Sequence, residues 1–151
     1  MFFKNFFSQS VLEFKYDDGG RSHAGYKGVA GDCVVRSIAI ATNLSYKKVY
    51  EDLYQANEIF RTTSKTKLAR SLKQKNDSPR MGTHRVVLKK YLLQLGWKWT
   101  PTMFIGQGCK IHLKKNELPN GTLIISCSKH ITVVKEGILH DTYDCSRNGT
   151  R

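Results

Sequence analysis

The sequence predicts an α+β domain, with helices in its first half and strands in its second. Between residues 33 and 96, apolar residues recur at the three- and four-residue spacing of helices that are buried on one face. After Gly96 the apolar residues alternate with polar ones, as they do in strands. No repeat or low-complexity segment interrupts this order. We therefore expect one domain over residues 1–151, in which the N-terminal helices pack on a C-terminal antiparallel sheet.

Three helices are expected in the first half of the chain. The segment 33–42 is apolar at most positions, and Asn43 after it is typical of a left-handed helix stop. The second helix follows Ser45, which is a good N-cap residue. The third has Thr83 as its expected cap and Gly96 as its expected stop.

The expected strands lie on both sides of these helices. One short strand, VLEFKY, precedes the first helix, and the turn DDGG follows it. Four more are expected after the third helix, in the segments WKWTPTMFI, LIISCS, HITVV and ILHDTYD. The segments LPNG and KEG supply turns between them.

The charge of the chain favours acidic partners. The 25 Lys and Arg residues outnumber the 12 Asp and Glu residues, so the formal net charge is +13. Acidic protein surfaces and nucleic acid both fit this balance. The excess is concentrated in a basic segment at about residues 61–82, which we expect to be an exposed insert. A solvated surface is one interpretation of such a run; the other is a docking surface for an acidic partner, formed by Arg61, Lys65, Lys67, Arg70, Lys73 and Lys75.

Two features favour a cytoplasmic protein. The phenylalanines near the N-terminus are interrupted by Lys4 and Asn5 well short of a signal-peptide core, and no other stretch has the length and hydrophobicity of a membrane span. The four cysteines form no CxxC pair. We therefore expect reduced thiols and no membrane partner.

Cys33 opens the first expected helix and is a candidate nucleophile. A thiolate nucleophile needs a lowered pKa, and the unpaired N–H groups and the dipole at a helix N-terminus provide it. Gly28 and Gly31 let backbone and substrate approach the sulfur closely. Asp32 is placed to cap the helix or to orient a loop. The alternative is a buried cysteine that begins a core helix.

A base and a carboxylate follow on the expected strands. A cysteine nucleophile needs an imidazole within hydrogen-bond reach and an acceptor that holds the ring. If residues 136–137 form a two-residue hairpin turn, residue 132 opposes 141 and residue 130 opposes 143. Asp141 then lies diagonally beside His130 on the same face of the sheet. A bulge or a longer turn would bring Asp144 there instead.

The segment GDCVVRSIAIAT, with a strand histidine and a later aspartate, resembles the papain-like cysteine peptidases. It is similar to the nucleophile segments of ovarian-tumour-type deubiquitinases, in which two apolar residues, an Arg and a small residue follow the cysteine. Its Asp-Cys start also resembles that of the double-glycine leader peptidases. From Tyr16 onwards the chain most resembles small uncharacterised phage and bacterial proteins with a DCVVRAIAIAT-like helix and an HDTYDPS-like end. The resemblance implies a papain-like fold and a virus-encoded effector or peptidase.

The resemblance also implies roles for individual residues. Cys33 would be the nucleophile, His130 the general base, and Asp144 or Asp141 the carboxylate that orients the imidazole. Papain-like enzymes often have a Gln before the cysteine, at the position that Lys27 occupies here. Lys27 and the backbone N–H of Cys33 would then donate to the oxyanion. Such a site would cleave an amide, thioester or isopeptide bond of a protein or peptide, or transfer its acyl group, without a cofactor.

A zinc site is a rival interpretation of the same region. The segments CKIH and CSKH have matching spacing, and a tetrahedral site would draw its ligands from Cys109, His112, Cys127 and His130, with His140 and Cys145 close by. We expect no metal, because strand positions three apart point to opposite faces of the sheet, and convergence on one ion would require a turn at Ser128–Lys129.

The alternative function is a small basic nucleic-acid-binding protein, or a catalytically inactive binding module. Trp97 and Trp99 flank Lys98, and aromatic residues interleaved with cations can stack on bases and neutralise phosphates. Core packing is the simpler interpretation of this pair.

Overall fold

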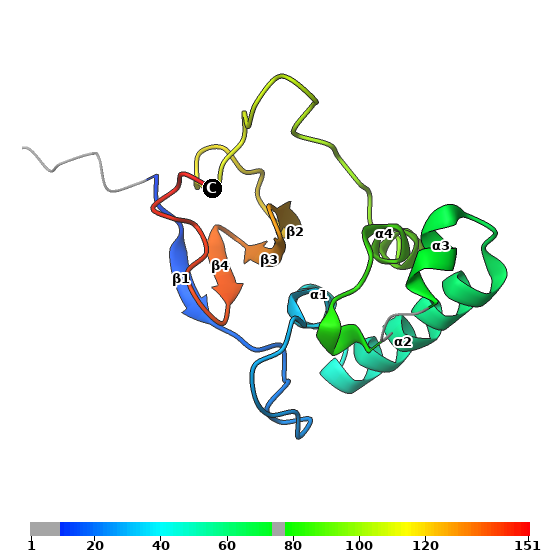
Figure 1. Ribbon diagram of the computed structural model, residues 1–151. Coiled ribbons are helices and arrows are strands. Elements are labelled where there is room, and N and C mark those ends of the chain that lie inside the picture. The colour runs from blue at the N-terminus through cyan, green and yellow to red at the C-terminus, as the bar shows by residue number, and fades with distance from the viewer. Residues whose placement is uncertain (1–9, 74–77) are drawn as a thin grey trace, which may run out of the picture. The chain divides into compact units, whose positions relative to one another are not determined.

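The computed structural model describes residues 10–73 and 78–151, which form two compact units (Figure 1). The sheet unit consists of residues 10–17 and 100–151, and the helical unit consists of Asp18–Trp99. Helices and strands are thus segregated along the chain, which confirms the predicted α+β class.

The sheet unit contains a four-stranded mixed sheet with the strand order β1-β4-β3-β2. The strands are β1 (Glu13–Tyr16), β2 (Thr122–Cys127), β3 (His130–Lys135) and β4 (Ile138–Asp141). Strands β2, β3 and β4 are antiparallel neighbours, but β1 runs parallel to β4. The prediction of an antiparallel sheet is therefore wrong for its β1 edge. Because a long connection, and not a hairpin turn, joins β1 to β4, the two strands can run parallel.

Strands β3 and β4 form a hairpin whose turn is Glu136–Gly137. Both residues have positive φ, 49° and 78°, as a type I′ turn requires. Val134 pairs with Leu139, which is the register predicted from the sequence. Since β3 begins at His130 and β4 ends at Asp141, these two residues lie at the same end of the hairpin.

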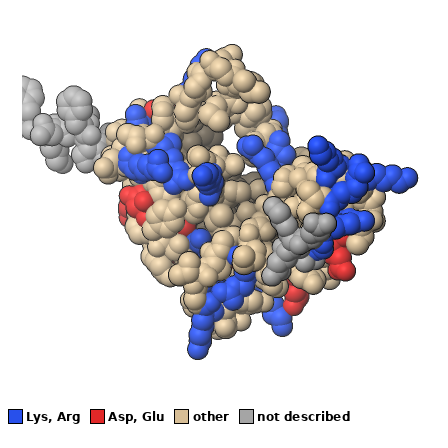
Figure 2. Space-filling model, in the orientation of Figure 1, with Lys and Arg blue, Asp and Glu red and all other residues tan. Residues whose placement is uncertain are grey.

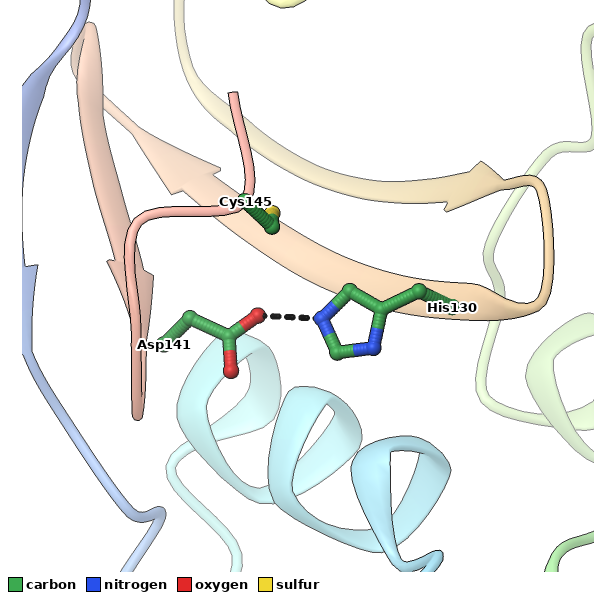
Figure 3. A group of neighbouring side chains, drawn as sticks. All are labelled: His130, Asp141 and Cys145. Atoms are coloured by element: carbon green, nitrogen blue, oxygen red, sulfur yellow. Dashed lines mark hydrogen bonds and ion pairs between the residues drawn. The ribbon is translucent and has the colours of Figure 1, made fainter. Parts of the chain in front are cut away.

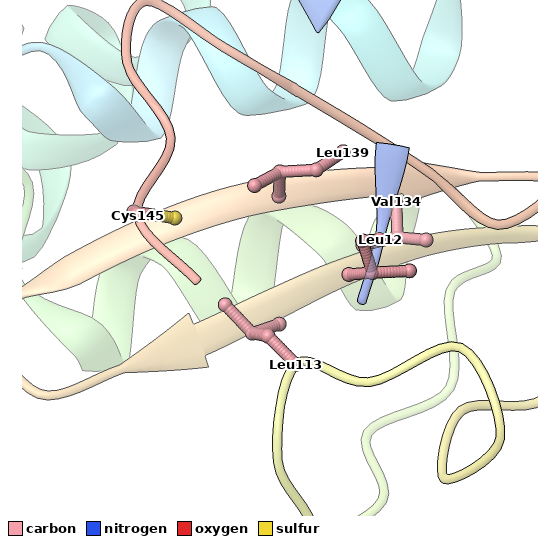
Figure 4. Close-up of a cluster of buried hydrophobic side chains, with 5 residues drawn as sticks. All are labelled: Leu12, Leu113, Val134, Leu139 and Cys145. Carbon is pink, nitrogen blue, oxygen red and sulfur yellow. The ribbon is translucent and has the colours of Figure 1, made fainter. Parts of the chain in front are cut away.

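One face of the hairpin carries the core of the sheet unit (Figure 4). Val134 and Leu139 project from it into a buried cluster that also contains Leu12, Leu113 and Cys145. Because side chains alternate between the two faces of a strand, His130 and Asp141 project from the same face as Val134 and Leu139. The apolar core therefore continues directly into a polar group.

The helical unit contains α1 (Cys33–Thr42), α2 (Tyr46–Thr63), α3 (Lys67–Leu72), the 3₁₀-helix η2 (Pro79–Met81) and α4 (Arg85–Gln94). The predicted bounds of α1 are confirmed, and Asn43 ends it with φ 58°. Ser45 caps α2 by accepting the N–H of Lys48. None of the helices within the described ranges has the length and hydrophobicity needed to cross a membrane.

One expectation for the second half of this unit needs correction. His84, not Thr83, caps α4, because the His84 imidazole accepts the N–H of Val86 at 3.2 Å. The described part of the predicted basic insert is largely exposed, and it contains helical structure. Helix α2 runs on to Thr63, and α3 packs against α2 with Ala69 fully buried. The many charged residues around Ala69 conceal this short apolar contact in the sequence.

The expected strand WKWTPTMFI is absent from the structure, in which only the isolated bridge between Met103 and Cys109 is formed there. Pro101 removes a backbone donor, and Ile105 is fully exposed. The ring of Trp99 instead lies against the cations of Arg85 and Lys89, at 5.3 Å and 4.3 Å from the ring centroid. The alternation in this segment therefore does not reflect a half-buried strand.

A buried carboxylate holds the start of α1. Asp32 accepts the Tyr46 hydroxyl at 2.7 Å and Nε of Arg36 at 3.1 Å, and Nε of Arg21 lies 3.4 Å away. Its side chain makes no cap hydrogen bond, so the expectation that it caps the helix is wrong. A buried carboxylate gains more from cationic donors than from a single N–H. Burial, together with the bond to Asp32, raises the pKa of Tyr46 and keeps the phenol a donor.

Replacement of this carboxylate should destabilise the fold strongly. In Asp32→Ala, the buried Arg36 loses its ion pair with Asp32, so we expect the free energy of unfolding to fall by about 3–5 kcal/mol. Urea unfolding followed by circular dichroism measures it. The matched control is Glu51→Ala, which removes an exposed ion pair with Lys47 and should cost less than about 0.5 kcal/mol. Equal losses in the two variants would contradict the importance of Asp32.

Candidate active site

A buried histidine–carboxylate pair lies at the open end of the β3–β4 hairpin (Figure 3). Nε2 of His130 and Oδ2 of Asp141 are 2.7 Å apart, and the two residues are only 9% and 2% exposed. The pair follows from the hairpin register, which sets the two residues diagonally on one face. The predicted neighbourhood of His130 and Asp141 is therefore confirmed.

Several backbone contacts hold Asp141 in place. Its second carboxylate oxygen, Oδ1, accepts the N–H of Thr142 at 2.7 Å. Its carbonyl accepts the N–H of Asp17 at 2.8 Å, and its Cα partner on β1 is Tyr16. The carboxylate that faces His130 is thus fixed by the residue after it and by the neighbouring edge strand.

The pair determines which nitrogen of the imidazole can act as a base. A carboxylate only accepts hydrogen bonds, so Nε2 of His130 carries the proton that Asp141 accepts. In the neutral ring the lone pair then lies on Nδ1, and the carboxylate stabilises the imidazolium when that nitrogen takes up a proton. The ring of Tyr143 packs beside the imidazole, with 5.2 Å between the ring centroids.

Asp144, the other carboxylate considered from the sequence, serves a local turn. It is exposed, and its Oδ1 accepts the N–H of Ser146 at 2.9 Å. The two-residue turn at Glu136–Gly137 has no bulge that would shift Asp144 toward His130. Asp141 is the carboxylate that contacts the imidazole.

The other predicted site residues belong to the helical unit. Cys33 is the first residue of α1 and is partly buried, directly after the anchored Asp32. Lys27 has an exposed side chain, and its carbonyl accepts the guanidinium of Arg80. The roles of Cys33, Lys27 and Asp32 in catalysis stay predictions.

The sequence patterns indicate Cys145 only as a residue close to a four-ligand zinc site and do not place it beside Asp141. Its thiol joins the pair, and the three ligand atoms of His130, Asp141 and Cys145 lie within 4.8 Å of one another. No strand period predicts this arrangement, because the chain leaves the sheet after Asp141 and Cys145 returns from an irregular segment. A cysteine four residues beyond the aspartate was the only available signal.

The four-ligand zinc site considered from the sequence does not form among the described residues. Cys109 is exposed and its thiol donates to the carbonyl of Ile111, while His112 hydrogen-bonds Glu117 at 3.0 Å. Residues 109 and 112 are thus engaged elsewhere, whereas Cys127 and His130 are Cα partners at the end of the β2–β3 hairpin.

A second histidine–carboxylate contact lies on the opposite face of β4. Nδ1 of His140 is 3.1 Å from Oδ2 of Asp17, which follows β1. Sequence reasoning treated His140 as an ordinary polar residue, because nothing in a local pattern predicts a partner from the parallel edge strand.

No protein-family model, curated protein or solved structure matches the chain.

The burial of Cys127 should show in its reactivity. Burial raises the pKa of the Cys127 thiol, and the neighbouring Cys145 adds to this effect. A raised pKa means a smaller thiolate fraction at any given pH, so at about pH 7 we expect iodoacetamide to label Cys127 more slowly than the exposed Cys109. The difference between the two labelling rates should become smaller as the pH rises above the ordinary pKa of a thiol. Peptide mass spectrometry measures both rates, and equal rates at neutral pH would contradict the prediction.

Proposed function

We propose that this protein is a thiol-dependent hydrolase of the papain-like type. In this proposal Cys33 is the nucleophile, His130 the general base and Asp141 the carboxylate that orients the imidazole. The observation that carries it is the buried 2.7 Å contact of His130 with Asp141, which assigns the basic lone pair to Nδ1. The resemblance of the Cys33 segment to papain-like nucleophile segments supports the same assignment.

The position of Cys33 supports its role as the nucleophile. It occupies the first turn of α1, where the helix dipole stabilises a thiolate. The buried ion pairs of Asp32 fix the backbone immediately before it. The proposal requires the thiol of Cys33 to come within hydrogen-bond reach of Nδ1 of His130.

The reaction steps follow from these groups. Nδ1 of His130 takes the proton of the Cys33 thiol, and the thiolate adds to an amide or isopeptide carbonyl. The N–H of Cys33, with Lys27, donates to the oxyanion that forms. The imidazolium then gives its proton to the leaving amine, so that a thioester remains on Cys33. A water molecule, deprotonated by His130, adds to the thioester, releases the acid and restores the thiol.

An acidic substrate surface fits the charges of the helical unit. Lys65, Lys67, Arg70 and Lys73 are exposed, and no carboxylate of the described residues pairs with them. Figure 2 shows Lys and Arg side chains gathered over α2 and α3. Arg61 is partly buried and donates to the carbonyl of residue 73, and residue 75, the last predicted contact, lies outside the described residues.

The resemblance to phage proteins favours a virus-encoded effector that acts on a host protein in the host cytoplasm. The four exposed cations of α3 and its flanks are also compatible with nucleic acid, which is the alternative partner. The cation contacts on the Trp99 ring occupy a face that a base would need for stacking. We therefore place protein substrates first.

Alkylation of Cys33 tests the proposed pair of thiol and imidazole. At about pH 6, iodoacetamide should label Cys33 at least about tenfold faster in the wild type than in His130→Ala, because loss of the imidazole returns the thiol to its ordinary pKa. Asp141→Asn should slow the labelling as well, and Asp144→Asn should leave it unchanged. Intact-mass and peptide mass spectrometry measure the rates.

His140→Ala is the matched control, since it removes an imidazole from the adjacent strand that contacts Asp17 instead. Its labelling rate at Cys33 should equal that of the wild type. If Cys33 reacts no faster than the exposed Cys109 at this pH, or if His130→Ala has no effect, Cys33 is not an activated nucleophile.

Charge removal on α3 tests the docking surface. In Lys67→Gln/Arg70→Gln, binding of a fluorescent poly-glutamate peptide should weaken about fivefold, since each exposed charge contributes about 0.5 kcal/mol. Lys47→Gln/Lys48→Gln is the control, because both lysines already pair with carboxylates on α2. Fluorescence anisotropy measures the affinity. An equal effect of both double variants would argue against a specific surface, and tighter binding of a single-stranded oligonucleotide at the same salt concentration would favour nucleic acid.

A further inference from the structure

Three side chains with different donor atoms converge beside the core of the sheet unit. The nitrogen, oxygen and sulfur atoms of His130, Asp141 and Cys145 lie within 4.8 Å of one another. Figure 3 shows that they come from β3, from the end of β4 and from the segment after β4. His130, Asp141 and Cys145 are 9%, 2% and 1% exposed, so the group is mostly buried.

This donor set matches the chemistry of Zn²⁺. The ion binds imidazole, carboxylate and thiolate at about 2.0–2.3 Å, and a tetrahedral arrangement then separates the ligand atoms by roughly 3.3–3.8 Å. The distances in the group bracket this separation, since Nε2 and Oδ2 are 2.7 Å apart and all three atoms lie within 4.8 Å. An ion would therefore replace the hydrogen bond of His130 with Asp141 after small side-chain rotations.

The charges of the group also favour a divalent ion. One thiolate and one carboxylate neutralise Zn²⁺, and a neutral complex is the form that a buried position tolerates. On binding, Cys145 releases its proton to solvent, and the ring proton of His130 moves from Nε2 to Nδ1. One proton leaves the site in total, so the affinity should fall as the pH falls.

We propose that His130, Asp141 and Cys145 form a site for Zn²⁺. The fourth position of the ion is left to water. Binding itself does not depend on the proposed function. A consequence for activity rests on that function: an ion on Nε2 moves the ring proton to Nδ1, which removes the lone pair that the base needs, so Zn²⁺ would inhibit the enzyme reversibly.

Cys127 provides a matched control for the sulfur ligand. It packs against the same apolar cluster as Cys145, and it is the Cα partner of His130. Its sulfur is not part of the group of converging ligand atoms. Removal of either thiol deletes one sulfur from the same region, but only the Cys145 variant deletes a proposed ligand.

Co²⁺ titration tests the site, with absorption spectroscopy of the whole chain as the readout. We expect one equivalent of Co²⁺ to produce a thiolate-to-cobalt charge-transfer band that Zn²⁺ abolishes. The band should be absent in His130→Ala and Cys145→Ala, and present in Cys127→Ala and Cys33→Ala. In the wild type it should weaken as the pH is lowered.

Circular dichroism shows whether each variant is folded. Even if Cys145→Ala does not fold, the cobalt absorption spectrum of the wild type tests the site. Absence of the band in the wild type overturns the proposal, and so does its persistence in folded Cys145→Ala or its loss in Cys33→Ala or Cys127→Ala. Failure of the proposed function looks different. In that case the labelling rate of Cys33 would be the same in His130→Ala as in the wild type, while the cobalt band of the wild type would still appear.

Discussion

The register of the β3–β4 hairpin is the constraint on which the candidate site depends. Side chains alternate along a strand, so a shift of one residue would place His130 and Asp141 on opposite faces. Two features fix the register: the Glu136–Gly137 turn, with positive φ at both residues, and the buried pair of Val134 with Leu139. The apolar core thus determines the geometry of the polar pair beside it.

Each unit is organised around a buried carboxylate, but the two carboxylates have different partners. Asp32 faces two arginines and a phenol, and these contacts make it a structural anchor for α1. Asp141 faces an imidazole, a group that can both donate and accept a proton. This difference is why the base is proposed in the sheet unit.

Local patterns predicted much of the fold and part of the site. The helix over residues 33–42 and its stop at Asn43 follow from periodicity and capping, whereas hairpin geometry left Asp141 and Asp144 as alternatives beside His130. The parallel pairing of β1 and the return of Cys145 could not be predicted, because they depend on contacts between segments far apart in the chain or outside regular structure. The alternation around Trp99 predicts a strand that does not form, and the ring of Trp99 lies instead against the cations of α4.

The parallel pairing of β1 with β4 also has a consequence for the order of folding. The partners Tyr16 and Asp141 are separated by the whole helical unit and two other strands, so their contact closes a long loop. During synthesis on a ribosome, β1 emerges before β4 and cannot pair until β4 has been made. The helical unit is one continuous segment, and it is synthesised between the two strands. Since β1 holds the backbone of Asp141, the imidazole–carboxylate pair reaches its final geometry only after the helical unit has been synthesised. A nascent chain would therefore carry the Cys33 thiol well before it carries an ordered pair of His130 and Asp141.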